Sequence, residues 1–165
     1  MTRKIRIRAA LVTATALVAA ATVTVGISAA GGDQPKKPSE KQIAALFDGW
    51  NAALQTGKPQ VVADRYAEDA VLLPTLSNEV RHDRAGIVDY MEHFLQNKPV
   101  GKKIETHIDI LDSDSALDSG VYQFTLTDKA TGKKKVVEAR YSYEYEKRNG
   151  NWKIVSHHSS AMPEG

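Results

Sequence analysis

The pattern of apolar residues changes its period at Gly101, and this change constrains the fold more than any other feature of the sequence. Before Gly101 apolar residues recur at helical spacing, whereas after it they alternate with polar residues, as in strands with one buried face. The alternating runs cover residues 104–110, 122–126, 136–147 and 152–160. Asn149-Gly150, between the last two runs, favours a tight hairpin turn. Helices followed by an antiparallel meander predict an α+β fold, in which the sheet curls over the helices and leaves a pocket at its open end.

Three helices and a short strand are predicted ahead of the sheet. Ser39 and Gln42 have the spacing of a capping box, so the first helix is expected to begin there. Residues 59–66 predict a second, short helix, and Asp83 can cap a third. A brief strand is predicted over residues 70–74.

The first 30 residues have the composition of a secretory signal peptide. A basic head precedes an uncharged apolar run over residues 9–30, which ends in the small residues Ser28-Ala29-Ala30. These parts predict a cleaved signal peptide over residues 1–30 and secretion of the rest. The apolar run is also long enough to span a bilayer, so an uncleaved membrane anchor is the alternative. Residues 31–38, rich in Gly and Pro, predict a flexible linker to a folded domain over residues 39–163.

Composition excludes several classes of function. The chain has 22 Lys and Arg and 20 Asp and Glu, but four of the basic residues lie in the N-terminal head, which leaves the exported part with a net charge of −2. With no basic patch or nucleic-acid motif, no nucleic-acid partner is expected. The chain has no cysteine, so disulfides and thiolate catalysis are excluded. No dinucleotide-binding motif is present, and no cofactor is expected.

Three stretches of the sequence resemble bacterial relatives of the calcium/calmodulin-dependent protein kinase II association domain, also grouped as SgcJ/EcaC-type or SnoaL-like proteins of the nuclear transport factor two-like superfamily. They are residues 47–75, 80–101 and 139–164. The most specific parts are the Trp-x-x-Val-x-x-His-x-Ser ending from Trp152 to Ser160, Arg140, and Trp50-Asn51. The resemblance covers residues 40–163. It implies a cone-shaped α+β barrel with a deep pocket, assembled into dimers or larger rings, and it does not imply kinase activity.

Strand alternation predicts which residues of the last strand face the pocket. Trp152, Ile154, His158 and Ser160 share one face, and its apolar members place that face on the concave side. His158 and Ser160 are therefore expected to line the pocket, or to satisfy each other as polar residues at a strand end. His157 is expected to face outward. Because His157 and His158 lie on opposite faces they cannot share a metal ion, and no metal site is predicted.

The resemblance adds further pocket residues. Arg140 matches a pocket arginine of the association domain, and Gln123 stands where that domain has another. Arg140 has two open roles: it can grip a carboxylate of a ligand, or form a buried salt bridge with an acid such as Glu138. Tyr66, with its neighbours Asp64 and Asp69, could supply a pocket acid, as in isomerases of the superfamily. The predicted ligand-binding residues are Trp50, Asn51, Tyr66, Gln123, Arg140, His158 and Ser160.

A stripe of three tyrosines bears on self-association. If Arg140 points inward, Tyr141, Tyr143 and Tyr145 point outward, and an aromatic stripe of that size predicts a subunit interface. Ordinary core packing of these side chains is the alternative.

Two functions follow from these features. The first is a secreted, self-associating domain that forms a homodimer or larger ring and binds a small polar molecule without catalysis. The second is a cofactor-free isomerase, cyclase or dehydratase acting on a small carbonyl compound. In the second function His158 is the candidate catalytic base, because histidine titrates near neutral pH.

Overall fold

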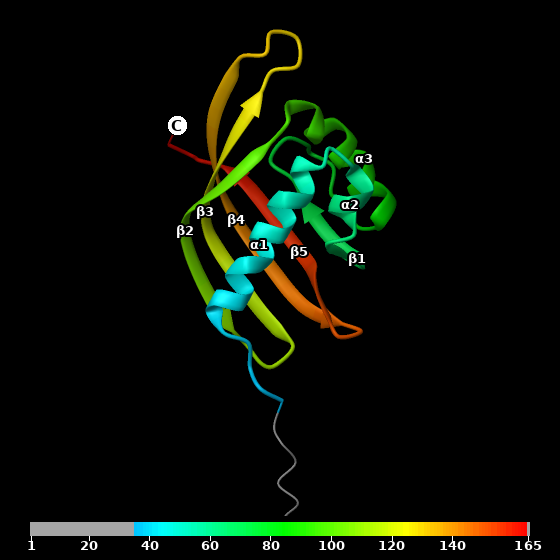
Figure 1. Ribbon diagram of the computed structural model, residues 1–165, viewed down its shortest axis with the longest axis vertical. Helices are drawn as coiled ribbons and strands as arrows, with labels where there is room; N and C mark the ends of the chain where they lie inside the picture. The colour runs from blue at the N-terminus through cyan, green and yellow to red at the C-terminus, as the bar shows by residue number, and fades with distance from the viewer. Residues whose placement is uncertain (1–34, 165) are drawn as a thin grey trace, which may run out of the picture. The chain divides into compact units, whose positions relative to one another are not determined.

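The computed structural model describes residues 35–164, so the predicted signal peptide and the first residues of the predicted linker lie outside the described residues. The predicted α+β fold is confirmed: helices come first, and a five-stranded sheet follows (Figure 1). The elements are α1 (Glu40–Gln55), α2 (Pro59–Ala63), β1 (Tyr66–Leu73), α3 (Arg84–Phe94), a 3-10 turn (Leu95–Asn97), β2 (Val100–Ile110), β3 (Ser115–Thr127), β4 (Lys134–Arg148) and β5 (Asn151–Ala161).

The sheet is a meander with one added strand. Its strand order is β1-β5-β4-β3-β2, and β2 to β5 form the predicted antiparallel meander. Asn149 and Gly150 both have positive φ, 53° and 79°, as the predicted hairpin turn between β4 and β5 requires. β1 pairs with β5 in parallel, which makes the sheet mixed. The first strand of the sequence, β1, therefore lies beside the last strand, β5.

The helices begin where their capping residues predict. Ser39 accepts a hydrogen bond from the Gln42 backbone and the Gln42 side chain accepts one from Ser39, which completes the capping box of α1. Asp83 accepts from Gly86 N and caps α3. In Figure 1, α1 lies across one face of the sheet, and α2 and α3 lie beside β1. Within residues 35–164, no helix is both long and apolar enough to cross a membrane.

A bulge in β2 requires a glycine at position 120 of β3. The pairing of β2 with β3 shifts between Lys103 and Glu105, so Ile104 has no partner and is 49% exposed. The bulge brings the Glu105 carbonyl oxygen against Gly120, where a Cβ atom would lie 2.0 Å from it. Any side chain at position 120 would push the two strands apart.

The tyrosines of β4 pack in the core, so the predicted interface stripe is wrong. Tyr141, Tyr143 and Tyr145 are 3%, 0% and 1% exposed on the inner face of the sheet, whereas Arg140 is exposed on the outer face. Three phenol rings bury far more apolar surface than the alternate positions of this strand can offer. The rings of Tyr143 and Tyr145 stack with their centroids 5.5 Å apart. The strand is thus turned opposite to the orientation that a pocket arginine requires.

Candidate functional site

A cavity of about 570 Å³ opens on the inner face of the sheet, a size typical of small-molecule sites. Its walls come from α1, α3, the end of β1 and the inner faces of β3, β4 and β5. Most of the lining is apolar or aromatic, including Met91 and Phe94 of α3 and Phe124 of β3. Within residues 35–164, no group of three or more His, Cys, Asp or Glu side chains is placed to hold a metal ion.

A bulge in β5 decides which polar residues of that strand reach the cavity. Ile154 pairs with Tyr145 and Ser156 pairs with Glu144, so Val155 is an extra residue without a partner in β4. One inserted residue shifts the following side chains to the opposite face of the sheet. Simple alternation therefore fails from Val155 onward.

The predicted orientation of the strand end is wrong for this reason. Ile154 and His157 are both buried, 2% and 3% exposed, although they are three positions apart and simple alternation would place them on opposite faces. His157 and Ser159 line the cavity. His158, the candidate catalytic base, is exposed on the outer face, and Ser160 lies on the same face beside Arg140.

Six side chains form one line of hydrogen-bonding groups, here called the His157 chain. Its members in order are Trp50, Tyr66, His157, Tyr122, Ser159 and Thr75. Trp50 Nε1 donates to Tyr66 Oη over 3.1 Å, and Tyr66 Oη lies 2.9 Å from His157 Nδ1. The chain thus joins α1, β1 and β5 beside the cavity.

Trp50 sets the direction of the His157 chain, because an indole N–H can donate but cannot accept. Tyr66 receives that hydrogen bond and keeps its own proton for His157 Nδ1. Within residues 35–164 the Tyr66 hydroxyl has no other hydrogen-bond partner, so the opposite arrangement would leave a buried proton unpaired, at a cost of about 1–3 kcal/mol. His157 is therefore the tautomer that carries its proton on Nε2.

The chain continues from His157 to the edge of the cavity. Nε2 lies 3.5 Å from Tyr122 Oη, a long hydrogen bond in which the nitrogen donates. Tyr122 donates to Ser159 Oγ over 2.5 Å, and Ser159 Oγ lies 2.5 Å from Thr75 Oγ1. Thr75 is exposed, so the chain runs from the buried indole to the accessible part of the pocket.

Burial keeps the His157 chain uncharged. Burial lowers the pKa of His157 to about 3, and the neighbouring His158 contributes in the same direction. Burial also raises the pKa of Tyr66 and of Tyr122 above the ordinary value for a phenol. At neutral pH the imidazole is neutral and both phenols are protonated.

Two more predicted site residues lie outside the cavity. Arg140 pairs with Val121 and Ser160 on the outer face of the sheet and is exposed, so its predicted place in the pocket is wrong. Gln123 pairs with Glu138 and is only partly buried, without contributing to the lining. Because the β4 tyrosines face inward, Arg140, which alternates with them, faces outward, and Gln123 lies on the same outer face.

Of the site residues predicted on α1 and β1, one contributes to the lining. Trp50 lines the cavity, and Tyr66 stands behind its wall with its hydroxyl group on His157. Asn51 does not reach the cavity: its side chain accepts from Gly101 N over 2.8 Å and donates to Gly101 O over 3.0 Å. Asn51 therefore ties α1 to the start of β2.

Four members of the His157 chain were not among the predicted site residues. They are Thr75, Tyr122, His157 and Ser159. Tyr122 could have been found, because it alternates with Phe124 and Leu126 on a strand whose apolar face must be inner. Thr75 follows β1, and only the parallel pairing of β1 with β5 brings it to Ser159.

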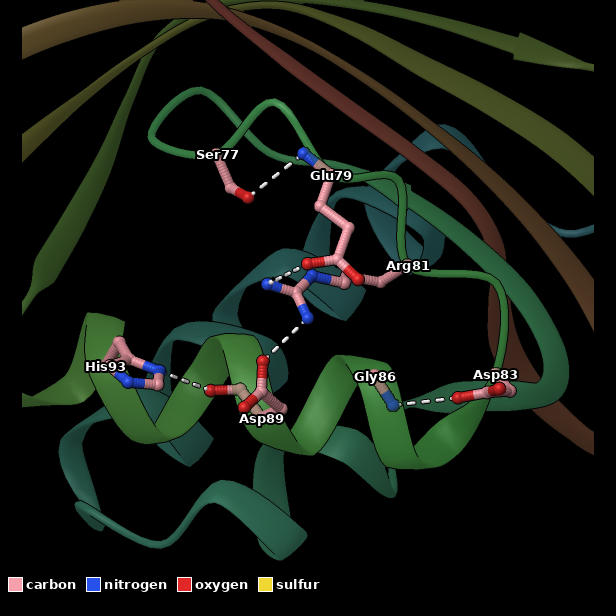
Figure 2. Close-up of polar contacts among 7 residues, drawn as sticks. All are labelled: Ser77, Glu79, Arg81, Asp83, Gly86, Asp89 and His93. Carbon is pink, nitrogen blue, oxygen red and sulfur yellow. Dashed lines mark hydrogen bonds and ion pairs between the residues drawn. The ribbon is translucent and has the colours of Figure 1, made fainter.

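A smaller hollow of about 330 Å³ lies beside the pocket and shares the wall made by Tyr90. Arg81 is one of its lining residues, and Figure 2 shows the Arg81 side chain pointing toward Glu79 and Asp89. Arg81 lies 2.6 Å from Asp89 and 3.3 Å from Glu79, and its side chain is 13% exposed. Two carboxylates balance its one charge, so this hollow presents no excess positive charge to an anion. The ion pairs hold the segment after β1 against α3.

Comparison with known proteins identifies the family. The sequence profile of the calcium/calmodulin-dependent protein kinase II association domain matches residues 39–163. The chain belongs to this association domain family. A Xanthomonas campestris protein described as such an association domain is 55% identical, with a TM-score of 0.76 over 81% of this chain and 97% of that one.

More distant structures share the fold of this association domain. The association domain of the Caenorhabditis elegans kinase is 13% identical, with a TM-score of 0.60 over 73% of this chain and 94% of that chain. A Novosphingobium aromaticivorans protein described as a scytalone dehydratase is 14% identical, with a TM-score of 0.66 over 74% and 83%. A structure described as nuclear transport factor two-like is also similar, at 10% identity and a TM-score of 0.62 over 76% and 82%. No protein with curated annotation is significantly similar to the chain.

Proposed function

We propose that this association domain binds a small molecule with an apolar body and one hydrogen-bond acceptor, such as a carbonyl group, in the 570 Å³ cavity. The observation that carries the proposal is the His157 chain, which ends at the accessible side of a mostly apolar cavity. Specific pockets commonly combine apolar walls with a few polar groups that orient the ligand. The small polar ligand expected from the sequence is thereby refined to a mainly apolar one.

The direction of the chain favours an acceptor on the ligand. Each member from Tyr66 to Tyr122 uses its proton on the next member, and Tyr122 donates to Ser159. Ser159 and Thr75 then have two hydroxyl protons and one hydrogen bond between them. One proton is left over, and in the bound state a carbonyl oxygen would accept it.

The same direction argues against acid–base catalysis by His157. Its Nδ1 lone pair accepts from Tyr66, and its Nε2 carries the proton that faces Tyr122. A pKa of about 3 also makes this imidazole a weak base at neutral pH. The isomerase, cyclase or dehydratase alternative would require His157 to exchange partners during the reaction. Binding without chemistry requires no such change.

Binding is tested with a ketone and a hydrocarbon of similar shape, 4-phenylbutan-2-one and butylbenzene, measured by calorimetry on the purified protein. One neutral hydrogen bond contributes about 0.5–1.5 kcal/mol, so the ketone is expected to bind about 2-fold to 10-fold more tightly. Ser159→Ala should remove most of that preference. Ser160→Ala, on the outer face, is the matched control and should keep it. Equal binding of both probes to the unaltered protein would contradict the proposal.

We propose further that the domain self-associates and is exported. Self-association is supported by membership of an association domain family. The β4 tyrosines, which were expected to form the subunit interface, are buried in the core and do not support it. Export is supported by the signal-like composition of residues 1–30. Sedimentation equilibrium should give at least a dimer at micromolar concentration, and a monomer would contradict the first point. N-terminal sequencing of the secreted protein should begin near Gly31, whereas an intact Met1 in the membrane would indicate the anchor.

A further inference from the structure

One cation stands on the wall of the apolar cavity. Among the described residues that line it, Lys135 alone has a positively charged side chain. Its partner across the sheet is Leu126, which is 5% exposed on the inner face, and cross-strand partners share a face. Val137 and Ala139, the next inner positions of β4, line the same cavity. Lys135 therefore belongs to the inner face, at the end of the wall where the strand becomes exposed.

Within residues 35–164 the ammonium group of Lys135 forms no ion pair; the carboxyl group it influences is that of exposed Asp128, whose pKa is lowered first by hydrogen bonds from Thr131 and to a lesser extent by the charge of Lys135. Two other lysines of the sheet are paired: Lys103 with Asp118, and Lys147 with Asp114. Glu138 also contributes to the lining, but its cross-strand partner is Gln123 on the outer face. The stem of a lysine can cover an apolar wall while its charge stays in water. Lys135 thus leaves a positive charge at the edge of an apolar site.

We infer that the ligand class is an amphiphilic anion: a molecule whose carboxylate pairs with Lys135 at the mouth while its apolar body fills the cavity. The inference rests on the proposed function and adds a charge to its ligand. The two polar positions are separate, since Lys135 is on β4 beyond Val137, and Ser159 and Thr75 are on β5 and after β1. An apolar spacer between the carboxylate and the acceptor group fits the apolar wall between them.

The test compares 4-phenylbutanoate with its neutral analogue 4-phenylbutanamide, using dissociation constants measured by calorimetry at low and at high salt. A partly exposed ion pair corresponds to about 2-fold to 5-fold in affinity, and the carboxylate should bind more tightly by that factor at low salt. Lys135→Gln should abolish the difference between the carboxylate and the amide. Lys134→Gln is the control. Lys134 is next to Lys135, is the cross-strand partner of Thr127 and lies on the opposite face of the sheet, so removing its charge should change neither dissociation constant.

The outcomes separate this inference from the proposed function. If the amide binds and the carboxylate binds no better, the inference fails while the proposed pocket stands. A carboxylate preference that survives Lys135→Gln, or that Lys134→Gln removes equally, also overturns the assignment to Lys135. If neither probe binds, the proposed function fails and the inference fails with it.

Discussion

Two groups of polar side chains are buried on the inner face of the same sheet, and they are built from different chemistry. The first, the Asp118 cluster, consists of Asp118, Lys103 and Tyr141. Asp118 is 0% exposed and is paired with Lys103, and Tyr141 donates to it over 2.9 Å. The second is the His157 chain, which holds no charged group and ends at an open cavity.

The difference teaches which of the two serves the fold and which serves a ligand. The Asp118 cluster is closed: the Lys103 ammonium also lies over the Phe47 ring of α1, 5.1 Å from its centroid. Both carboxylate oxygens of Asp118 are used within the cluster, Oδ2 by Lys103 and Oδ1 by Tyr141, so the buried acid offers no free acceptor to a ligand. The His157 chain is open, because the last of its hydroxyl protons has no partner within the chain. Breaking the first should affect stability alone, and breaking the second at its open end, Ser159 and Thr75, should affect binding.

The largest effect is expected from Asp118→Ala. This change leaves the Lys103 charge partly buried without its partner, which costs about 3–5 kcal/mol of unfolding free energy. Urea unfolding measures the loss, and Asp109→Ala, at an exposed position of β2, is the control. At low temperature the folded fraction should still bind 4-phenylbutan-2-one with unchanged affinity. A stable variant that no longer binds would reverse the assignment of the two clusters.

Tyr66→Phe should also lower stability. It leaves Trp50 Nε1 and His157 Nδ1 without a partner, and each unsatisfied buried group costs about 1–3 kcal/mol. Tyr145→Phe is the matched control, because within the described residues the buried Tyr145 hydroxyl has no hydrogen-bond partner. That control should be neutral or slightly stabilising. If both changes cost the same, the hydroxyl group of Tyr66 has no special role.

The pH dependence of stability follows from His157. Its pKa is 6.5 when exposed and about 3 in the fold, so between these values the unfolded chain binds more protons than the folded one. The contribution to unfolding free energy is complete above about pH 6.5 and falls by up to about 1.4 kcal/mol for each pH unit below it. Urea unfolding from pH 7 to 5 should show this slope, and His157→Gln should lack it. Equal slopes in both proteins would mean that the imidazole is accessible to protons in the fold.

Local signals predicted the elements better than they predicted the site. The cap of α1, the cap of α3 and the Asn149-Gly150 turn each depend on residues close in sequence, and all three are confirmed. The parallel pairing of β1 with β5 joins residues more than 80 positions apart and has no local signal. Without that pairing, Thr75 could not be placed next to Ser159.

The site prediction failed because alternation assumes an unbroken strand. Ile154 is inner, as predicted, and the single bulge at Val155 carries His157 rather than His158 into the cavity. Placing His158 and Arg140 in the pocket also turned the tyrosines outward, so the two errors reinforced each other. Burial of three aromatic rings contributes more to the stability of the fold than placing one arginine in the pocket. This comparison gives the correct orientation of β4.

The state of the His157 ring is the most direct test of the directional chain. Nitrogen-15 NMR of the histidine side chains, with His157→Gln used to assign the signal, reports which ring nitrogen carries the proton. We predict a neutral ring with the proton on Nε2 and a bare Nδ1, unchanged from pH 8 to pH 5. A proton on Nδ1, or a doubly protonated ring by pH 6, would contradict the direction of the chain and the acceptor preference that follows from it.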